Sequence, residues 1–188
     1  MHPSMVSSDD YQAAYDLTEH LIAAGRERIG MITTREPKNR SNFELQRIRG
    51  YQASLLEHGI TPSADLVFYA DFTPEGGYDT VCKLLQSGSP LPEAFFCIGD
   101  VIAFGCMKAL REHGISIPED IAVVGMDDER ESEYVTPSLT SIHQNFEEIG
   151  REAVRLLHQR ITEGSTAPRK IFVPHTLMIR ESSWGKTC

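Results

Sequence analysis

The chain has 188 residues, of which 40% are hydrophobic and 24% are charged, and it contains 14 glycines and 10 prolines. This composition is typical of a globular protein and argues against a disordered, collagen-like or coiled-coil chain. The formal net charge of −9 argues against DNA binding by this chain itself, because phosphate backbones repel an acidic surface unless a basic patch overrides it.

Cysteine usage and hydropathy indicate a cytoplasmic protein. The four cysteines have no CxxC spacing, and the sequence begins without a basic and apolar export signal, so we expect reduced thiols. The longest apolar runs, 94–98 and 121–124, are far shorter than the ~20 residues that cross a bilayer, so no membrane partner is expected.

Helical and strand-like patterns alternate along the chain, and glycine stops and capping residues separate them. In chain order they predict a short extended piece ending at Val6, a helix over about 9–24, a strand over 28–33, a helix over about 45–58, a strand over 66–70, a helix over about 74–85, a strand over 94–98, a helix over 100–113, a strand over 121–126, an irregular polar stretch over 127–144, a helix over about 146–157 and a last strand over 170–180.

The predicted strands are apolar almost without alternation, which indicates that helices cover both faces of the sheet. Four of them begin at residues 28, 66, 94 and 121, spacings close to one βαβ unit each. The sequence therefore predicts a three-layer α/β fold with a mostly parallel sheet between helices.

Sequence motifs for common enzyme chemistries are missing. The chain has no GxGxxG, GxxxxGK[ST], GxSxG or HExxH motif, and its histidines lack metal-ligand spacing. We therefore expect no catalytic residue, no metal and no cofactor.

Polar and aromatic residues follow the predicted strands, at the sheet edge where ligands bind in layered α/β folds. They are residues 34–43 with Arg47, Asp71 with Phe72, Gly99 with Asp100, and Asp127 with Asp128. Such a set suits a small polar ligand. Each member has a structural alternative: Asp100 as a helix cap, Arg47 as a solvated helix residue, Phe72 as core, and the Asp127–Asp128 pair as an Asx turn.

The stretch 121–144, IAVVGMDDERESEYVTPSLTSIHQ, resembles the LacI/GalR family of bacterial transcription regulators. That family has a strand, Gly, an aromatic residue, Asp-Asp or Asp-Asn, a variable loop, and then Pro-x-Leu-Thr, Thr or Ser, Ile or Val, and Gln. Further matching segments occur in the family's order at 21–30, 47–51, 99–105, 114–120 and 177–182.

This resemblance implies a type I periplasmic-binding-protein-like fold whose C-terminal lobe spans residues 1–144. Residues 145–188, the returning helix and final strand, would partly belong to an N-terminal lobe, and the sequence is expected to be part of a longer regulator. The resemblance places two residues at a homodimer interface, Phe104 and Tyr134. It implies the following ligand contacts: Arg47, Phe72, Asp127, Gly99, Asp100, Ser41, Phe43 and Gln144.

The resemblance implies an effector that is a sugar, or a purine or nucleoside. Segments 71–78 and 96–100 are similar to the purine-binding branch of the family, whereas Ser41 and Phe43 stand where that branch has polar or charged contacts, and Met126 where the family often has an aromatic residue. DNA would be bound only through a helix-turn-helix outside this sequence.

We hypothesise an effector-sensing part of a repressor, in which the ligand shifts the population between open and closed lobes. Alone, the chain is expected to bind effector weakly, because half of the cleft wall would be missing. The alternatives are a periplasmic solute-binding protein of a sugar transporter and, less favoured, an α/β enzyme.

Overall fold

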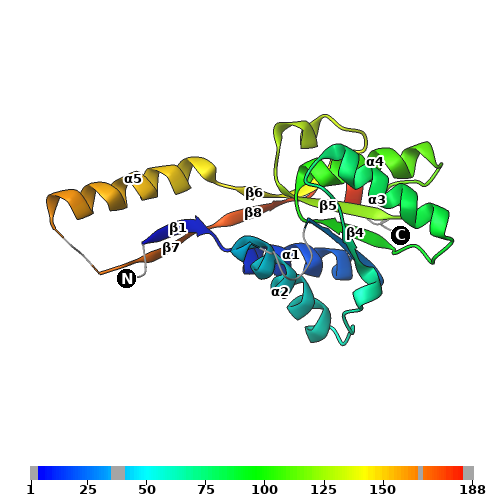
Figure 1. Cartoon of the computed structure of the whole chain (residues 1–188), viewed down its shortest axis with the longest axis horizontal. Coiled ribbons are helices and arrows are strands. Elements are labelled where there is room, and N and C mark those ends of the chain that lie inside the picture. The colour runs from blue at the N-terminus through cyan, green and yellow to red at the C-terminus, as the bar shows by residue number, and fades with distance from the viewer. Residues whose placement is uncertain (1–3, 35–40, 165–166, 184–188) are drawn as a thin grey trace.

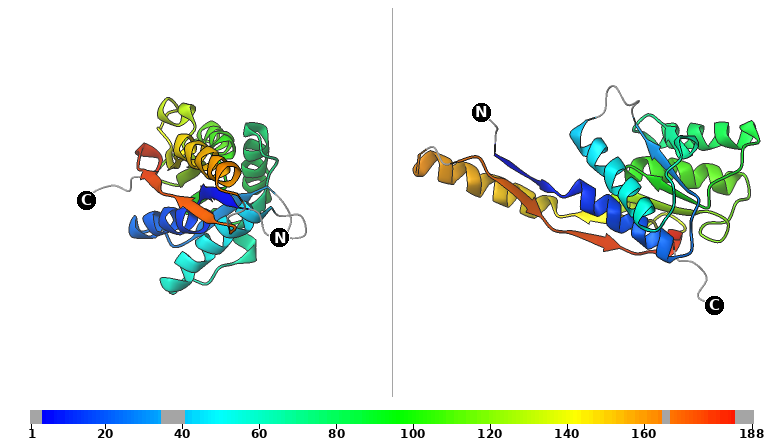
Figure 2. Two further views of the ribbon diagram at one scale, coloured as in Figure 1. Left: turned by 90° about the vertical axis from the view of Figure 1, so that its left-hand side faces the viewer. Right: turned by 90° about the horizontal axis from the view of Figure 1, so that it is seen from below.

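The computed structural model of the chain describes residues 4–34, 41–164 and 167–183, and these form a lobe with a long arm projecting from it (Figure 1). The lobe holds the larger sheet and most of the helices. The arm holds a two-stranded sheet and one long helix, and the right view of Figure 2 shows it extending away from the lobe.

A six-stranded sheet forms the centre of the lobe. Its order is β3 (Val67–Tyr69), β2 (Ile29–Thr33), β4 (Ala94–Cys97), β5 (Ala122–Asp127), β6 (Thr140–Gln144) and β8 (His175–Met178). Neighbouring strands are parallel except for the antiparallel pair β6 and β8. Because the other strands run parallel, their carboxyl ends share one edge of the sheet.

Helices cover both faces of this sheet. They are α1 (Asp10–Ala23) and α2 (Asn42–Glu57) on one face, and α3 (Pro74–Ser87) and α4 (Asp100–Glu112) on the other (Figure 1). The residues of β2 and β4 are buried throughout, which explains their unbroken apolar sequences. Tyr51 of α2 meets Phe96 edge-to-face with ring centroids 6.0 Å apart, and its hydroxyl donates to the Ile29 carbonyl at 2.8 Å.

The arm consists of the parallel pair β1 (Met5–Ser8) and β7 (Lys170–Val173), with α5 (Phe146–Thr162) packed along it. Three short connections join the arm to the lobe: β1 to α1, β6 to α5, and β7 to β8. Of the two expected segments, 1–144 includes strand β1, which lies in the arm, and 145–188 includes strand β8, which lies in the larger sheet.

The predicted three-layer α/β fold is confirmed, but two local predictions are wrong. Residues 140–144, expected to be irregular because they are polar, form strand β6, since the buried Thr140 and Ser141 side chains find hydrogen-bond partners. The expected single strand over 170–180 is two strands in different sheets, separated at Pro174, which has no N–H to continue a ladder.

Short 3-10 turns complete the described fold: η2 (Ala64–Leu66), η3 (Arg130–Glu133) and η4 (Glu181–Ser183). No helix within the described ranges combines the length and the apolar character needed to span a bilayer.

Candidate functional site

A cavity of about 430 Å³ lies at the carboxyl edge of the large sheet, where the lobe meets the arm. The lobe contributes polar side chains to it, and the arm contributes Val6, Phe146 and Ile149. A neighbouring cavity of about 330 Å³ shares the side chains of Phe43 and Phe72. Any molecule filling the first cavity therefore touches both the lobe and the arm.

Arg47 is the central cation of this cavity. Its side chain is 6% exposed, and its Nε donates to Asp10 Oδ1 at 2.9 Å. One terminal nitrogen donates to the Ile98 carbonyl at 2.5 Å, and the other to Asp127 Oδ1 at 3.3 Å. The structural alternative, in which Arg47 is a solvated helix residue, is excluded, because two carboxylates and a carbonyl hold its guanidinium in the cavity wall.

Asp127 ends strand β5 and faces Arg47. The amide nitrogen of Gln144 donates to Asp127 Oδ1 at 2.5 Å, so this one oxygen accepts both bonds. Among the described residues, none donates to Oδ2. Burial raises the pKa of Asp127, while Arg47 and Gln144 act in the opposite direction. The carboxylate is thus oriented and keeps an acceptor oxygen for a ligand.

Two aromatic rings form the apolar walls. Phe43 is 43% exposed and Phe72 is 50% exposed, and both line the cavity, so a ligand there can contact both side chains. The Arg47 guanidinium lies 5.2 Å from the centroid of the Phe43 ring. Gly99 makes room for Phe72, because a Cβ at Gly99 would lie 2.6 Å from the Phe72 ring.

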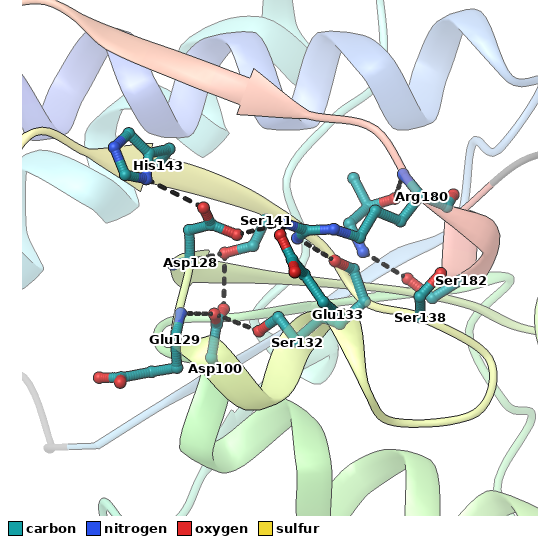
Figure 3. A network of polar contacts seen from close by, with 12 residues as sticks. Asp100, Asp128, Glu129, Ser132, Glu133, Ser138, Ser141, His143, Arg180 and Ser182 are labelled. Carbon is teal, nitrogen blue, oxygen red and sulfur yellow. Dashed lines mark hydrogen bonds and ion pairs between the residues drawn. The ribbon is translucent and has the colours of Figure 1, made fainter.

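Three residues that the sequence places among the ligand contacts lie outside the cavity lining: Gly99, Ser41 and Asp100. Ser41 precedes α2, and its backbone N–H and its hydroxyl both donate to the Glu44 carboxylate, at 2.7 and 2.5 Å. Asp100 is 1% exposed, and its carboxylate accepts hydrogen bonds from Ser132, Ser141 and the Glu129 amide (Figure 3). Burial, opposed by these bonds, raises the pKa of Asp100 to about 6.

The sequence reasoning missed four polar members of the cavity: Ser7, Ser8, Asp10 and Glu129. Asp10 opens α1 and would pass for a first-turn acid that favours the helix dipole. Ser8 ends the short strand β1, and its buried hydroxyl has no hydrogen-bond partner among the described residues. Ser8 ends β1 and Asp10 follows shortly after it, and this position at the carboxyl end of a strand was the sequence signal that could have placed them in the site.

The two residues expected at a dimer interface, Phe104 and Tyr134, lie outside the cavity lining. Phe104 of α4 lines a separate cavity of about 270 Å³ against α3, together with Tyr78 and Lys108. Tyr134 follows η3 and is 72% exposed. Within the described part of the chain, no group of three or more His, Cys, Asp or Glu side chains could hold a metal ion.

Comparison with known proteins gives consistent matches. The model of the periplasmic binding protein-like domain family matches residues 18–183. The HTH-type transcriptional repressor PurR of Haemophilus influenzae is 35% identical over 181 residues, which are 95% of this chain and 53% of that protein. The chain spans about half the length of the curated relatives it matches.

Solved structures show the same architecture. The complex of the transcriptional regulator CelR with cellobiose is 35% identical, with a TM-score of 0.87 over 96% of this chain and 54% of that chain. A LacI-family regulator from Enterococcus faecium with bound ribose is 28% identical, with a TM-score of 0.86 over 98% of this chain and 66% of that one.

Proposed function

This chain belongs to the periplasmic binding protein-like domain family, and from that membership we propose that it is the effector-sensing part of a LacI-type transcriptional repressor whose effector is a sugar. The observation that carries the proposal is the arrangement of Arg47, Asp127 and Gln144 beside two exposed aromatic rings. Polar groups that converge in this way on one side of a cavity fix the orientation of a small ligand.

The chemistry of the site suits a polyol. Asp127 Oδ2 can accept a hydroxyl hydrogen, and the N–H groups of Arg47 not used by Asp10, Ile98 and Asp127 can donate to hydroxyl oxygens. The rings of Phe43 and Phe72 suit the apolar C–H faces of a sugar ring. Relatives solved with cellobiose and with ribose support this class of ligand.

We propose that the effector acts by a population shift between two arrangements of lobe and arm. The cavity is lined by Arg47 and Asp127 from the lobe and by Phe146 and Ile149 from the arm, so a ligand gains contacts with both at once. A ligand that binds one arrangement better stabilises it by the difference in affinity, and that difference is available to a DNA-binding region elsewhere in the regulator.

The remaining proposals concern partners. We propose that Phe104 and Tyr134 contribute to a homodimer interface, with Tyr134 supported by its exposure. We also propose that the arm packs on a second lobe, because α5 leaves Val154, Leu157 and Ile161 more than half exposed along one stripe.

The proposal can be tested by NMR titration of the isotope-labelled chain with cellobiose, ribose and hypoxanthine at millimolar concentrations. We expect saturable shifts of cavity amides with at least one sugar, and loss of these shifts in Asp127→Asn and Arg47→Met. Arg49→Met is the matched control, because Arg49 lies exposed on the same helix. Saturable shifts with hypoxanthine alone would contradict the sugar proposal, and sugar shifts that survive Asp127→Asn would contradict the site.

A further inference from the structure

A network of hydrogen bonds converges on the buried Asp100 (Figure 3), and one of its members, Glu129, also lines the cavity. The Ser141 hydroxyl donates to Asp100 Oδ1 at 2.7 Å. The Ser132 hydroxyl and the Glu129 amide donate to Oδ2 at 2.7 and 2.8 Å. Three donors from two other segments of the chain therefore end on one carboxylate that is itself 1% exposed.

This network holds the backbone that follows Asp127. The Asp128 amide donates to the Ser141 hydroxyl at 3.1 Å, and that hydroxyl donates onward to Asp100. The amides of residues 128 and 129 are thus fixed to the same carboxylate, one through a hydroxyl and one directly. The Asp128 carboxylate lies 2.7 Å from Arg180 and 2.9 Å from His143, which fixes the side chain as well.

The backbone held in this way is in a conformation that it would not adopt by itself. Asp127 has a φ of 115° and Asp128 a φ of 54°, both in the region that residues with a Cβ rarely occupy. Such values persist only where the surroundings impose them. Within the described residues, Asp100 and Ser141 supply the bonds to the amides that follow this turn.

The sequence also makes room for Asp100 beneath the loop. Gly125 pairs with Ser141 across β5 and β6, and a Cβ at Gly125 would lie 2.1 Å from Asp100 Oδ1. The φ of Gly125 is not positive, so the glycine is needed for space and not for an unusual backbone conformation. The Asp100 carboxylate can therefore occupy its position only because residue 125 has no side chain.

We propose that Asp100 is a positioning residue for ligand binding. It does not touch the ligand, but fixes the turn from Asp127 to Ser132, so that the side chains of Asp127 and Glu129 face the cavity. The inference rests on the proposed function for the identity of the ligand, whereas its statement about the turn concerns the chain alone. In this proposal Asp100 is not the ligand contact that the sequence predicts, but holds the ligand contact Asp127 in place.

The test combines amide hydrogen exchange of the whole unliganded chain with sugar titration. The variants are Asp100→Ala, Asp100→Asn and Ser141→Ala. The matched control is Asp120→Asn, since the exposed Asp120 also accepts a backbone N–H, that of Ser116, outside the cavity lining.

We expect exchange at the amides of Asp128 and Glu129 to rise about tenfold in Asp100→Ala, the factor that loss of one charge-assisted hydrogen bond gives. Asp100→Asn keeps an acceptor for the Glu129 amide and should restore part of the protection. Ser141→Ala should affect Asp128 more than Glu129. Amides in the cores of α2 and β4 should not change, nor should any of these amides change in Asp120→Asn.

Sugar titration then separates the two proposals. If cellobiose or ribose binds the wild type, we expect Asp100→Asn to weaken that affinity by about three- to tenfold, as loss of one charge-assisted bond in the supporting network would. Unchanged exchange at Asp128 and Glu129 in both Asp100 variants would overturn the positioning role, even if sugar binds. Increased exchange in a chain that binds neither sugar would support the positioning role and count against the proposed function. Should Asp100→Ala fail to fold, Asp100→Asn and Ser141→Ala still decide the outcome.

Discussion

Replacement of Arg47 by methionine removes the one cation that the described residues contribute to the cavity lining, and keeps a flexible side chain of similar length. It leaves the Asp10 and Asp127 carboxylates, 18% and 19% exposed, without their counter-charge, and the Ile98 carbonyl without its donor. Removing one partner from a fully buried ion pair costs about 3–5 kcal/mol. Because water reaches both carboxylates in part, we expect the free energy of unfolding to fall by about 2–4 kcal/mol.

The assay is urea unfolding followed by circular dichroism, with linear extrapolation to water. The control is Arg49→Met, which changes an exposed arginine two residues along the same helix and should alter stability by no more than about 0.5 kcal/mol. A double variant, Arg47→Met with Asp127→Asn, should recover part of the loss, because the uncompensated charge at Asp127 is then absent.

The pH dependence gives a second check on the same reasoning. Burial raises the pKa of Asp127, and Arg47 opposes this, so the pKa of Asp127 should rise further in Arg47→Met. The folded variant then takes up a proton at a higher pH than the unfolded chain, and the stability deficit of Arg47→Met should shrink as the pH falls. A deficit equal to that of Arg49→Met at neutral pH, or one that grows on acidification, would refute the account.

Three further predictions follow from the network and the arm. Burial raises the pKa of Asp100 from 3.8 to about 6. The wild type should therefore gain up to about 3 kcal/mol of stability relative to Asp100→Asn as the pH falls from 7 to 4, and lose this gain as the pH rises through 6. Urea unfolding at a series of pH values that shows no such difference would contradict this. Gly125→Ala should lower the free energy of unfolding by at least about 3 kcal/mol in the same assay, because its Cβ would collide with Asp100 Oδ1, and a loss below 1 kcal/mol would show that Asp100 can move aside. Because α5 exposes an apolar stripe, we expect this chain to self-associate through it when no second lobe covers the stripe. Leu157→Glu and Ile161→Glu, at 60% and 73% exposed positions, should reduce that self-association in light scattering without lowering thermal stability, and a wild type that is already monomeric would contradict it.

One general rule of parallel sheets located much of the site in advance. Residues that follow parallel strands meet at one edge, and this brought Phe72 after β3 and Asp127 after β5 into one cavity with Arg47. The rule requires only that the strands are parallel, and their nearly unbroken apolar sequences already indicate a parallel sheet. It needs no knowledge of side-chain conformation.

What the sequence could not show depends on side-chain direction and on contacts between distant segments. Asp100 and Asp127 both follow buried strands, yet one faces the network and the other the cavity. The strand β6 was hidden for the same reason: Thr140 and Ser141 look like surface residues until Arg180 and Asp100 are seen beside them. Asp10 lies in the site because the connection from β1 in the arm to α1 in the lobe passes along the cavity.

The three aspartates at this edge illustrate why partners, and not residue type, decide the role. Asp127 has an arginine and an amide beside it and an oxygen left over, which suits a ligand contact. Asp128 lies between Arg180 and His143, which suits a structural ion pair. Within the part of the chain that the structure describes, Asp100 accepts from three neutral donors and from no cation, and burial raises its pKa to about 6. A neutral side chain at residue 100 could fill the same buried space. The carboxylate also supplies two acceptor oxygens, which bind three donors from β6 and from the turn that follows Asp127.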